Sequence, residues 1–149
     1  MQRTAAIKLD VTLEQTRQLT ALQAAYANAC NQLVPVVVAQ RCWNRVALHR
    51  LTYSRLRQAT PLGSQMVCNA IFTVCKAYKA QRGLGRIKKE LPIPTVNFRR
   101  ASIHFDKRTY TLRGETVSLY TLAGRITVRM ALGEHQRKLL AAGSPTDVP

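Results

Sequence analysis

The feature that most constrains the fold is a change in hydrophobic period near residue 92. Before it, apolar residues recur every three or four positions, as on one face of a helix; after it they alternate, as in a strand. A short alternating segment, residues 3–11, also precedes the helical part. A strand so far from its sheet partners predicts an α+β fold: a helical module inserted after the first strand of a small antiparallel β-barrel, of the wedge or OB-like kind.

The first helix is expected to begin after Thr12. Thr12 and Gln15 have the spacing of a capping box, in which each side chain bonds the other residue's backbone amide. The apolar stripe that follows runs to about Val34. Pro35 lacks an amide hydrogen, so we expect the helix to break or kink there and residues 36–42 to form a second, offset segment.

Two further helices are expected before the change of period. Residues 43–58 form a basic helix whose inward face is expected to carry Leu48, Leu51 and Leu56. The next helix is expected to start at Thr60-Pro61, because threonine suits a cap and proline the first helical position. It should end at Gly83, which can adopt the left-handed cap conformation.

Short strands joined by tight turns are expected after residue 98. Alternating apolar residues mark strands at 101–105, 110–112, 117–119 and 126–130, with residues 92–98 as a possible fifth. A helical tail is expected at 134–142. The predicted organisation is therefore a first barrel strand at 1–11, a helical module at 12–91, and the rest of an incomplete barrel at 92–149.

The charge of the chain points to a polyanionic partner. The 149 residues include 23 Lys and Arg against 7 Asp and Glu, for a net charge of +16, and 46% are hydrophobic, enough for a packed core. Residues 41–113 hold 16 of the basic residues and only two acidic ones, Glu90 and Asp106. We interpret this imbalance as a nucleic-acid footprint, with a solvated face or a membrane surface as the alternatives.

Catalytic and metal sites are not predicted. The seven carboxylates are scattered over turns, helix starts and exposed strand positions, whereas a two-metal nuclease needs several that converge. The four cysteines are 12, 26 and 7 residues apart and no histidine lies at zinc-ligand spacing from them, so buried free thiols are expected. No phosphate-binding loop, cofactor motif, secretory signal or membrane-spanning run is found, and the expected location is the cytoplasm.

Basic residues at helical spacing are the strongest binding candidates. Lys76, Lys79, Arg82 and Arg86 recur every three or four residues, as a ridge that could follow a phosphate backbone would. In the strand region, Tyr110 and Tyr120 lie among further basic residues, and core or rim packing is their simpler role. The residues expected to contact nucleic acid are Arg50, Tyr53, Arg57, Lys76, Lys79, Arg82, Arg86, Lys88, Lys89, Arg99, Arg100, Lys107, Arg108 and Arg125.

Two segments carry motifs of a known family. Residues 52–82 contain Leu56-Arg57, a helix start at Leu62–Gln65 and a helix end at Ala77–Lys79. Residues 101–130 contain a turn at Phe105–Tyr110 and a strand at Thr121–Ile126. Together they resemble the helical recognition region and the wedge-domain strands of TnpB (OrfB-family) proteins, the transposon-encoded ancestors of type V CRISPR effectors.

The resemblance implies that the chain holds a guide RNA and its heteroduplex with target DNA, and helps to read a short motif beside the target. It also implies that the RuvC-like nuclease and zinc ribbon lie after the wedge domain, whereas this sequence stops at Pro149. No catalytic residue can therefore be carried over, and we expect the chain alone not to be an enzyme. Three alternatives remain: a protein–protein half that docks a separately encoded nuclease, a general RNA-binding protein, and a stand-alone metal-dependent nuclease.

Overall fold

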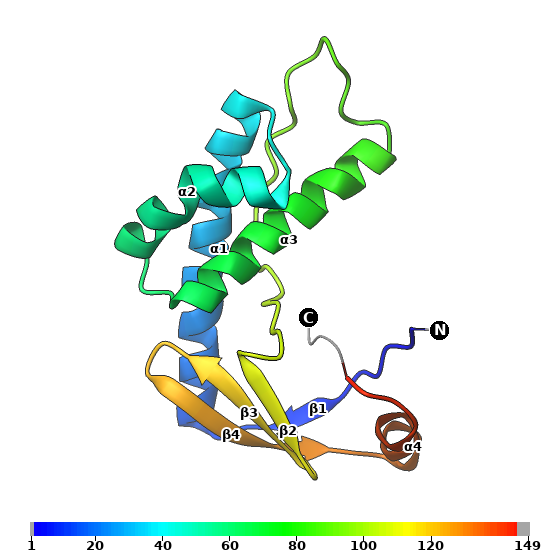
Figure 1. Cartoon of the computed structure of the whole chain (residues 1–149). Helices are drawn as coiled ribbons and strands as arrows, with labels where there is room; N and C mark the ends of the chain where they lie inside the picture. Colours follow the sequence, from blue (N-terminus) through cyan, green and yellow to red (C-terminus); the bar gives the residue numbers. More distant parts are fainter. Residues whose placement is uncertain (1, 146–149) are drawn as a thin grey trace.

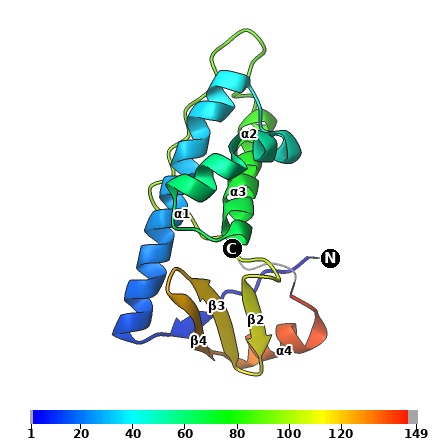
Figure 2. The same cartoon turned by 60° about the vertical axis from the view of Figure 1, so that its left-hand side comes forward.

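The computed structural model describes residues 2–145, which form an α+β fold with two parts (Figure 1). The helical part contains α1 (Leu13–Gln40), α2 (Arg45–Ala59) and α3 (Ser64–Gly83). The second part contains the strands β1 (Lys8–Asp10), β2 (Tyr110–Arg113), β3 (Thr116–Thr121) and β4 (Gly124–Ala131), with α4 (Glu134–Ala142) at one end of the sheet. Helix α1 runs along both parts, with its first turns beside the sheet (Figure 2).

The early strand does join the late ones, as the sequence predicts. The sheet is antiparallel in the order β1-β4-β3-β2, and Leu9 of β1 lies opposite Met130 of β4. Alternation places Val117, Leu119 and Val128 in the core and leaves the other sheet face polar. The capping box of Thr12 and Gln15 is also confirmed, with the Gln15 side-chain oxygen accepting the Thr12 amide. The Gln15 side-chain nitrogen donates to the Thr127 carbonyl, which ties the start of α1 to β4.

The sheet of the described residues is open, so the expected barrel is not confirmed. Residues 92–98 and 101–105, which were predicted to add strands, form none; Phe105 alone makes an isolated bridge. The physical reason is that helix side chains satisfy the backbone of this segment in place of a strand ladder. Asn31 of α1 donates to the Phe98 carbonyl (3.1 Å) and accepts from its amide (2.8 Å), and the Tyr78 hydroxyl donates to the Pro94 carbonyl (2.8 Å).

The predicted break at Pro35 is wrong, because α1 continues to Gln40. Pro35 lies on the exposed side, where water can hydrate the carbonyl that its missing amide leaves without a partner. On the inner side, Val34 and Val37 are buried on either side of the proline and hold the helix against the core. The helix ends where Arg41 adopts the left-handed conformation (φ 48°).

The start of α3 lies three residues later than predicted. Thr60 is the C-cap of α2 and its hydroxyl donates to the Leu56 carbonyl, so it does not cap α3. Gly63 is the N-cap, and its amide donates to the Tyr120 hydroxyl of β3 at 2.9 Å. Gly83 ends α3 as predicted, but the left-handed residue is Gly85 (φ 70°).

The core joins the three helices to the inner face of the sheet. Leu48 and Leu56 of α2 are buried as predicted, whereas Leu51 is 53% exposed and faces away from α1 and α3. All four cysteines are free. Cys30 and Cys75 are buried as predicted, whereas Cys42 and Cys68, which were also expected to be buried, are half-buried. Burial raises the pKa of the Cys30 thiol from 9.0 to about 12 and that of Tyr26 as well.

We expect the free energy of unfolding to decrease as the pH rises from about 9 to about 12. The unfolded chain releases the Cys30 proton near pH 9.0, whereas the folded chain retains it until about 12. The stability that this neutral thiol contributes is therefore fully present below pH 9 and is lost as the pH approaches 12. Urea denaturation in reductant at several pH values measures it, and Cys30→Ala, which lacks the thiol, should lose stability less steeply. Equal slopes for both proteins would contradict the prediction.

Candidate nucleic-acid interface

Helix α3 carries a row of exposed cations beside its buried stripe. Val74, Cys75 and Tyr78 are buried against the other helices, and Tyr78 is fixed by its hydrogen bond to Pro94. Lys76, Lys79 and Arg82, here called the basic ridge, are exposed along the last two turns of the same helix. Because helical positions three apart lie on one side, the packing that buries the inner stripe orients all three cations toward solvent.

The cations of the central region have no acidic partners. Within residues 2–145 the ion pairs are Arg17–Glu14, Arg137–Glu115 and Lys138–Glu134, and none involves a basic residue of the 41–113 segment. Asp106, one of the two acids of that segment, instead accepts hydrogen bonds from Gln65 and Thr109. The positive charge of the segment is therefore uncompensated within this part of the chain, and its field reaches the solvent.

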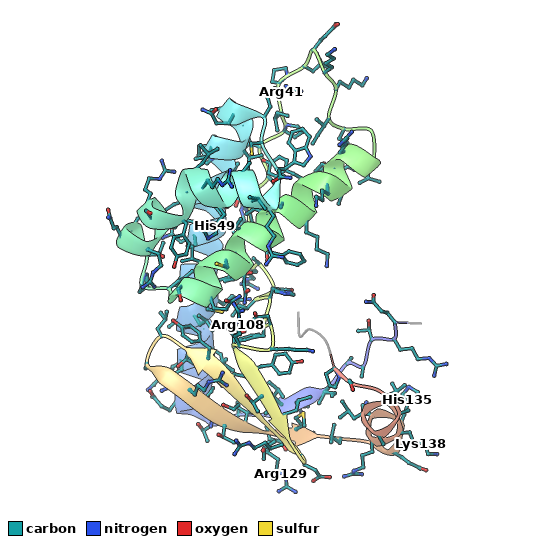
Figure 3. The ribbon with its side chains drawn as sticks, in the orientation of Figure 1. Arg41, His49, Arg108, Arg129, His135 and Lys138 are labelled. Atoms are coloured by element: carbon teal, nitrogen blue, oxygen red, sulfur yellow. The ribbon has the colours of Figure 1, made fainter. Side chains whose placement is uncertain are left out.

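A basic loop follows the ridge and is held in place by Arg41. One guanidinium nitrogen of Arg41 donates to the Leu91 carbonyl and the other to the Lys88 carbonyl, both at 2.9 Å. Figure 3 shows Arg41 beside this loop at the end of the helical part farthest from the sheet. The exposed Arg86, Lys88 and Lys89 thus lie at the same end of the molecule as Arg41.

A second group of predicted residues lies near the start of α3, where the helices meet the sheet. Arg108, labelled in Figure 3, donates to the Gln65 side chain (2.9 Å), and Arg57 donates to the Leu62 carbonyl (2.8 Å). Arg125 of β4 donates to the Arg108 carbonyl at 2.7 Å. The Arg108 bond joins the sheet part to α3, whereas the other two bonds lie within one part each. All three guanidinium groups therefore have fewer donors left for a ligand.

The polar face of the sheet forms a shallow hollow of about 330 Å³. Arg113 and Arg125 line it together with hydroxyl groups from three strands, and Arg129 of β4 lies beyond it on the side away from the helices (Figure 3). The hydroxyl-bearing residues are Thr111, Thr116, Ser118 and Thr127. This face adds a third cluster of exposed cations.

The predicted residues are therefore exposed but do not form one surface. The thirteen basic residues expected to contact nucleic acid are all exposed, and Tyr53 is half-buried, with its ring stacked 4.6 Å from that of His49 on α2. The Arg41 end and the Arg108 region are separated by most of the length of α3 in Figure 3. Arg50 lies on α2, and Arg99 and Arg100 lie on the bend that follows the segment held by Asn31.

The tyrosines of the sheet serve packing, as their simpler interpretation predicts. Tyr110 is 6% exposed, and the Tyr120 hydroxyl accepts a hydrogen bond from the Gly63 amide.

Two functional candidates were missed in the sequence analysis: Arg41, which holds the basic loop, and Trp43, the single tryptophan, two residues after it. The tryptophan between Arg41 and Arg45 was a signal that could have indicated these two candidates. The contact of Arg41 with the loop could not be read from the sequence, because the two are 47 residues apart along the chain.

Comparison with protein-family models, with characterised proteins and with solved structures finds no match for this chain. Between residues 2 and 145 no helix has the length and apolar character to cross a membrane. In the same range, no three His, Cys, Asp or Glu side chains come together as a metal site would require. The candidate interface thus depends on the geometry and charge described above.

Proposed function

We propose that this chain is the nucleic-acid-binding portion of a TnpB-like, transposon-associated, RNA-guided system, acting in the cytoplasm on a guide RNA and its target DNA. The observation that carries the proposal is the set of cations without acidic partners on α3 and on the loop that Arg41 holds. Such a rigid cationic surface suits contacts with the phosphate backbone, which position a nucleic acid without reading its sequence.

In this proposal the chain binds and does not cut. Four of its seven acids make contacts within the chain: Glu14, Glu115 and Glu134 form ion pairs, and Asp106 accepts hydrogen bonds from α3. These four carboxylates contact different partners on different elements, whereas phosphodiester hydrolysis needs several directed at one pair of metal ions. Cleavage of DNA would then depend on a nuclease region outside this sequence.

The test is recovery of the bound RNA. The chain is expressed in cells that contain a transposon of the TnpB type, purified at moderate salt, and its RNA is sequenced. We expect enrichment of transcripts from the transposon end over total RNA. Enrichment should be lost in a variant with Lys76, Lys79 and Arg82 replaced by alanine. Random cellular RNA without such enrichment would contradict the guide-RNA proposal and favour a general RNA-binding protein.

The open sheet favours a second candidate function, docking of a separately encoded nuclease chain. Within the described residues, β1 and β2 are the edges of the sheet and have backbone groups available to a further strand. A strand from a partner would extend the sheet and could complete the expected barrel. Co-expression with the neighbouring reading frame should give a stable complex, and a chain that purifies alone in its presence would contradict this candidate.

A further inference from the structure

A hollow lies where the connection between α1 and α2 meets the last turns of α3. Its volume is about 350 Å³, at the lower end of the range of roughly 300–1,000 Å³ that is usual for small-molecule sites. It is lined by Arg41, Cys42, Trp43, Asn44, Lys79 and Arg82. Two of these, Lys79 and Arg82, belong to the basic ridge, and Trp43 is half-buried.

The walls of the hollow are held by hydrogen bonds within the chain. The Asn44 side chain accepts the amides of Val46 and Ala47, both at 3.0 Å, and so fixes the start of α2. The Cys42 amide donates to the Val37 carbonyl, and the Arg41 guanidinium is bonded to the basic loop. The hollow is therefore formed before any ligand binds, which lowers the ordering cost of binding.

We propose that this hollow binds a single unpaired nucleotide of the nucleic acid that the chain holds. The base would lie against the indole of Trp43, and Lys79 and Arg82 would contact its flanking phosphates. An aromatic ring beside two cations without acidic partners is the arrangement that single-strand binding requires, because stacking is available to every base and the cations follow the backbone. The inference rests on the proposed function and adds a preference for single-stranded over fully paired nucleic acid at this position.

The single tryptophan makes the site directly observable, since the intrinsic tryptophan emission comes from Trp43 alone. Binding of labelled probes is measured by fluorescence anisotropy, and the emission of Trp43 is followed in parallel with unlabelled ones. The probes are oligouridine, an abasic oligomer of the same length and charge, and uridine monophosphate. We expect oligouridine to bind and to quench Trp43, and the abasic oligomer to bind more weakly without quenching it.

The possible results distinguish nucleotide binding in the hollow from nucleic-acid binding by the chain as a whole. If oligouridine binds but the Trp43 emission is unchanged, the proposal that a base binds in the hollow is wrong, and the proposal of nucleic-acid binding stands. Absence of any binding by anisotropy would overturn both. Quenching by uridine monophosphate as strong, at the same concentration, as by oligouridine would identify a site for a free nucleotide and overturn the assignment to a strand.

Variants test the role of the ring. Trp43→Leu should weaken oligouridine binding by roughly 5- to 150-fold, the range that corresponds to loss of one stacked base, and should leave the affinity for the abasic oligomer unchanged. The unchanged abasic affinity also shows that the variant is folded. Trp43→Phe should restore most of the loss. Lys138→Ala, which removes a cation on α4 at the sheet end of the molecule (Figure 3), is the matched control and should change neither affinity. Equal weakening of both probes by Trp43→Leu would overturn the stacking role.

Discussion

Replacing Lys76, Lys79 and Arg82 with alanine should weaken binding of single-stranded RNA or of duplex DNA on the order of 100-fold at 0.15 M salt. Each lost phosphate contact should also reduce the slope of log affinity against log salt by roughly 0.7 to 0.9, or about 2 to 2.7 for all three. The three side chains are exposed and lack acidic partners, so their removal costs the fold little. Binding measured over a series of salt concentrations gives both quantities.

The matched control removes the same charge from elsewhere. Arg17, Arg137 and Lys138 are exposed and paired with Glu14, Glu115 and Glu134. Their joint replacement by alanine also lowers the net charge by three, but it removes cations that are already compensated, and the slope should change by less than one. Equal losses in the two triple variants would show that net charge alone matters. An unchanged slope in the first would show that the basic ridge contacts only solvent.

Asp106→Ala should lower the free energy of unfolding by about 1–3 kcal/mol, because three donors at the junction of helix and sheet each lose one of their acceptors. The Asp106 carboxylate accepts from Thr109 (2.8 Å), from Gln65 (2.9 Å) and from Asn69 (3.4 Å). Thr109 and Asn69 are each 2% exposed, so water cannot easily replace the lost acceptor. Asn69 also donates to the His104 carbonyl, and the same network therefore holds residues 104–109 against α3.

Urea or thermal denaturation measures the effect. Asp106→Asn keeps one acceptor oxygen and should be less destabilising than Asp106→Ala. Glu134→Ala, which removes an exposed carboxylate paired with Lys138, is the control and should cost less than about 0.5 kcal/mol. A midpoint for Asp106→Ala equal to that of the unmodified protein would contradict this role. These stabilities also bear on the alternative of a stand-alone nuclease. If an Asp106 variant lost nuclease activity, its unfolded fraction would have to be measured before the loss could be assigned to catalysis.

Local signals in the sequence predicted most of the secondary structure. The capping box at Thr12, the end of α3 at Gly83, the two hairpin turns before Thr116 and Gly124, and α4 were all correctly placed. These features depend on residues three or four apart, or on a glycine in a turn, and a neighbouring segment is enough to specify them. The errors at Pro35 and at residues 92–105 lie where contacts distant in sequence decide the conformation. The error at Thr60 is local, because its hydroxyl caps the end of α2 through the Leu56 carbonyl.

The sequence by itself determined the α+β class, the insertion of helices after the first strand, and the excess of positive charge on residues 41–113. Only the tertiary structure decided that the sheet of the described residues stays open, because Asn31 and Tyr78 take up the backbone groups of a segment whose alternation is typical of a strand. It alone brought Arg41 to the loop after α3 and placed Trp43 beside Lys79 and Arg82. Periodicity describes which face of an element is buried, whereas a site also depends on which elements pack together, and that is set by contacts among residues far apart in the chain.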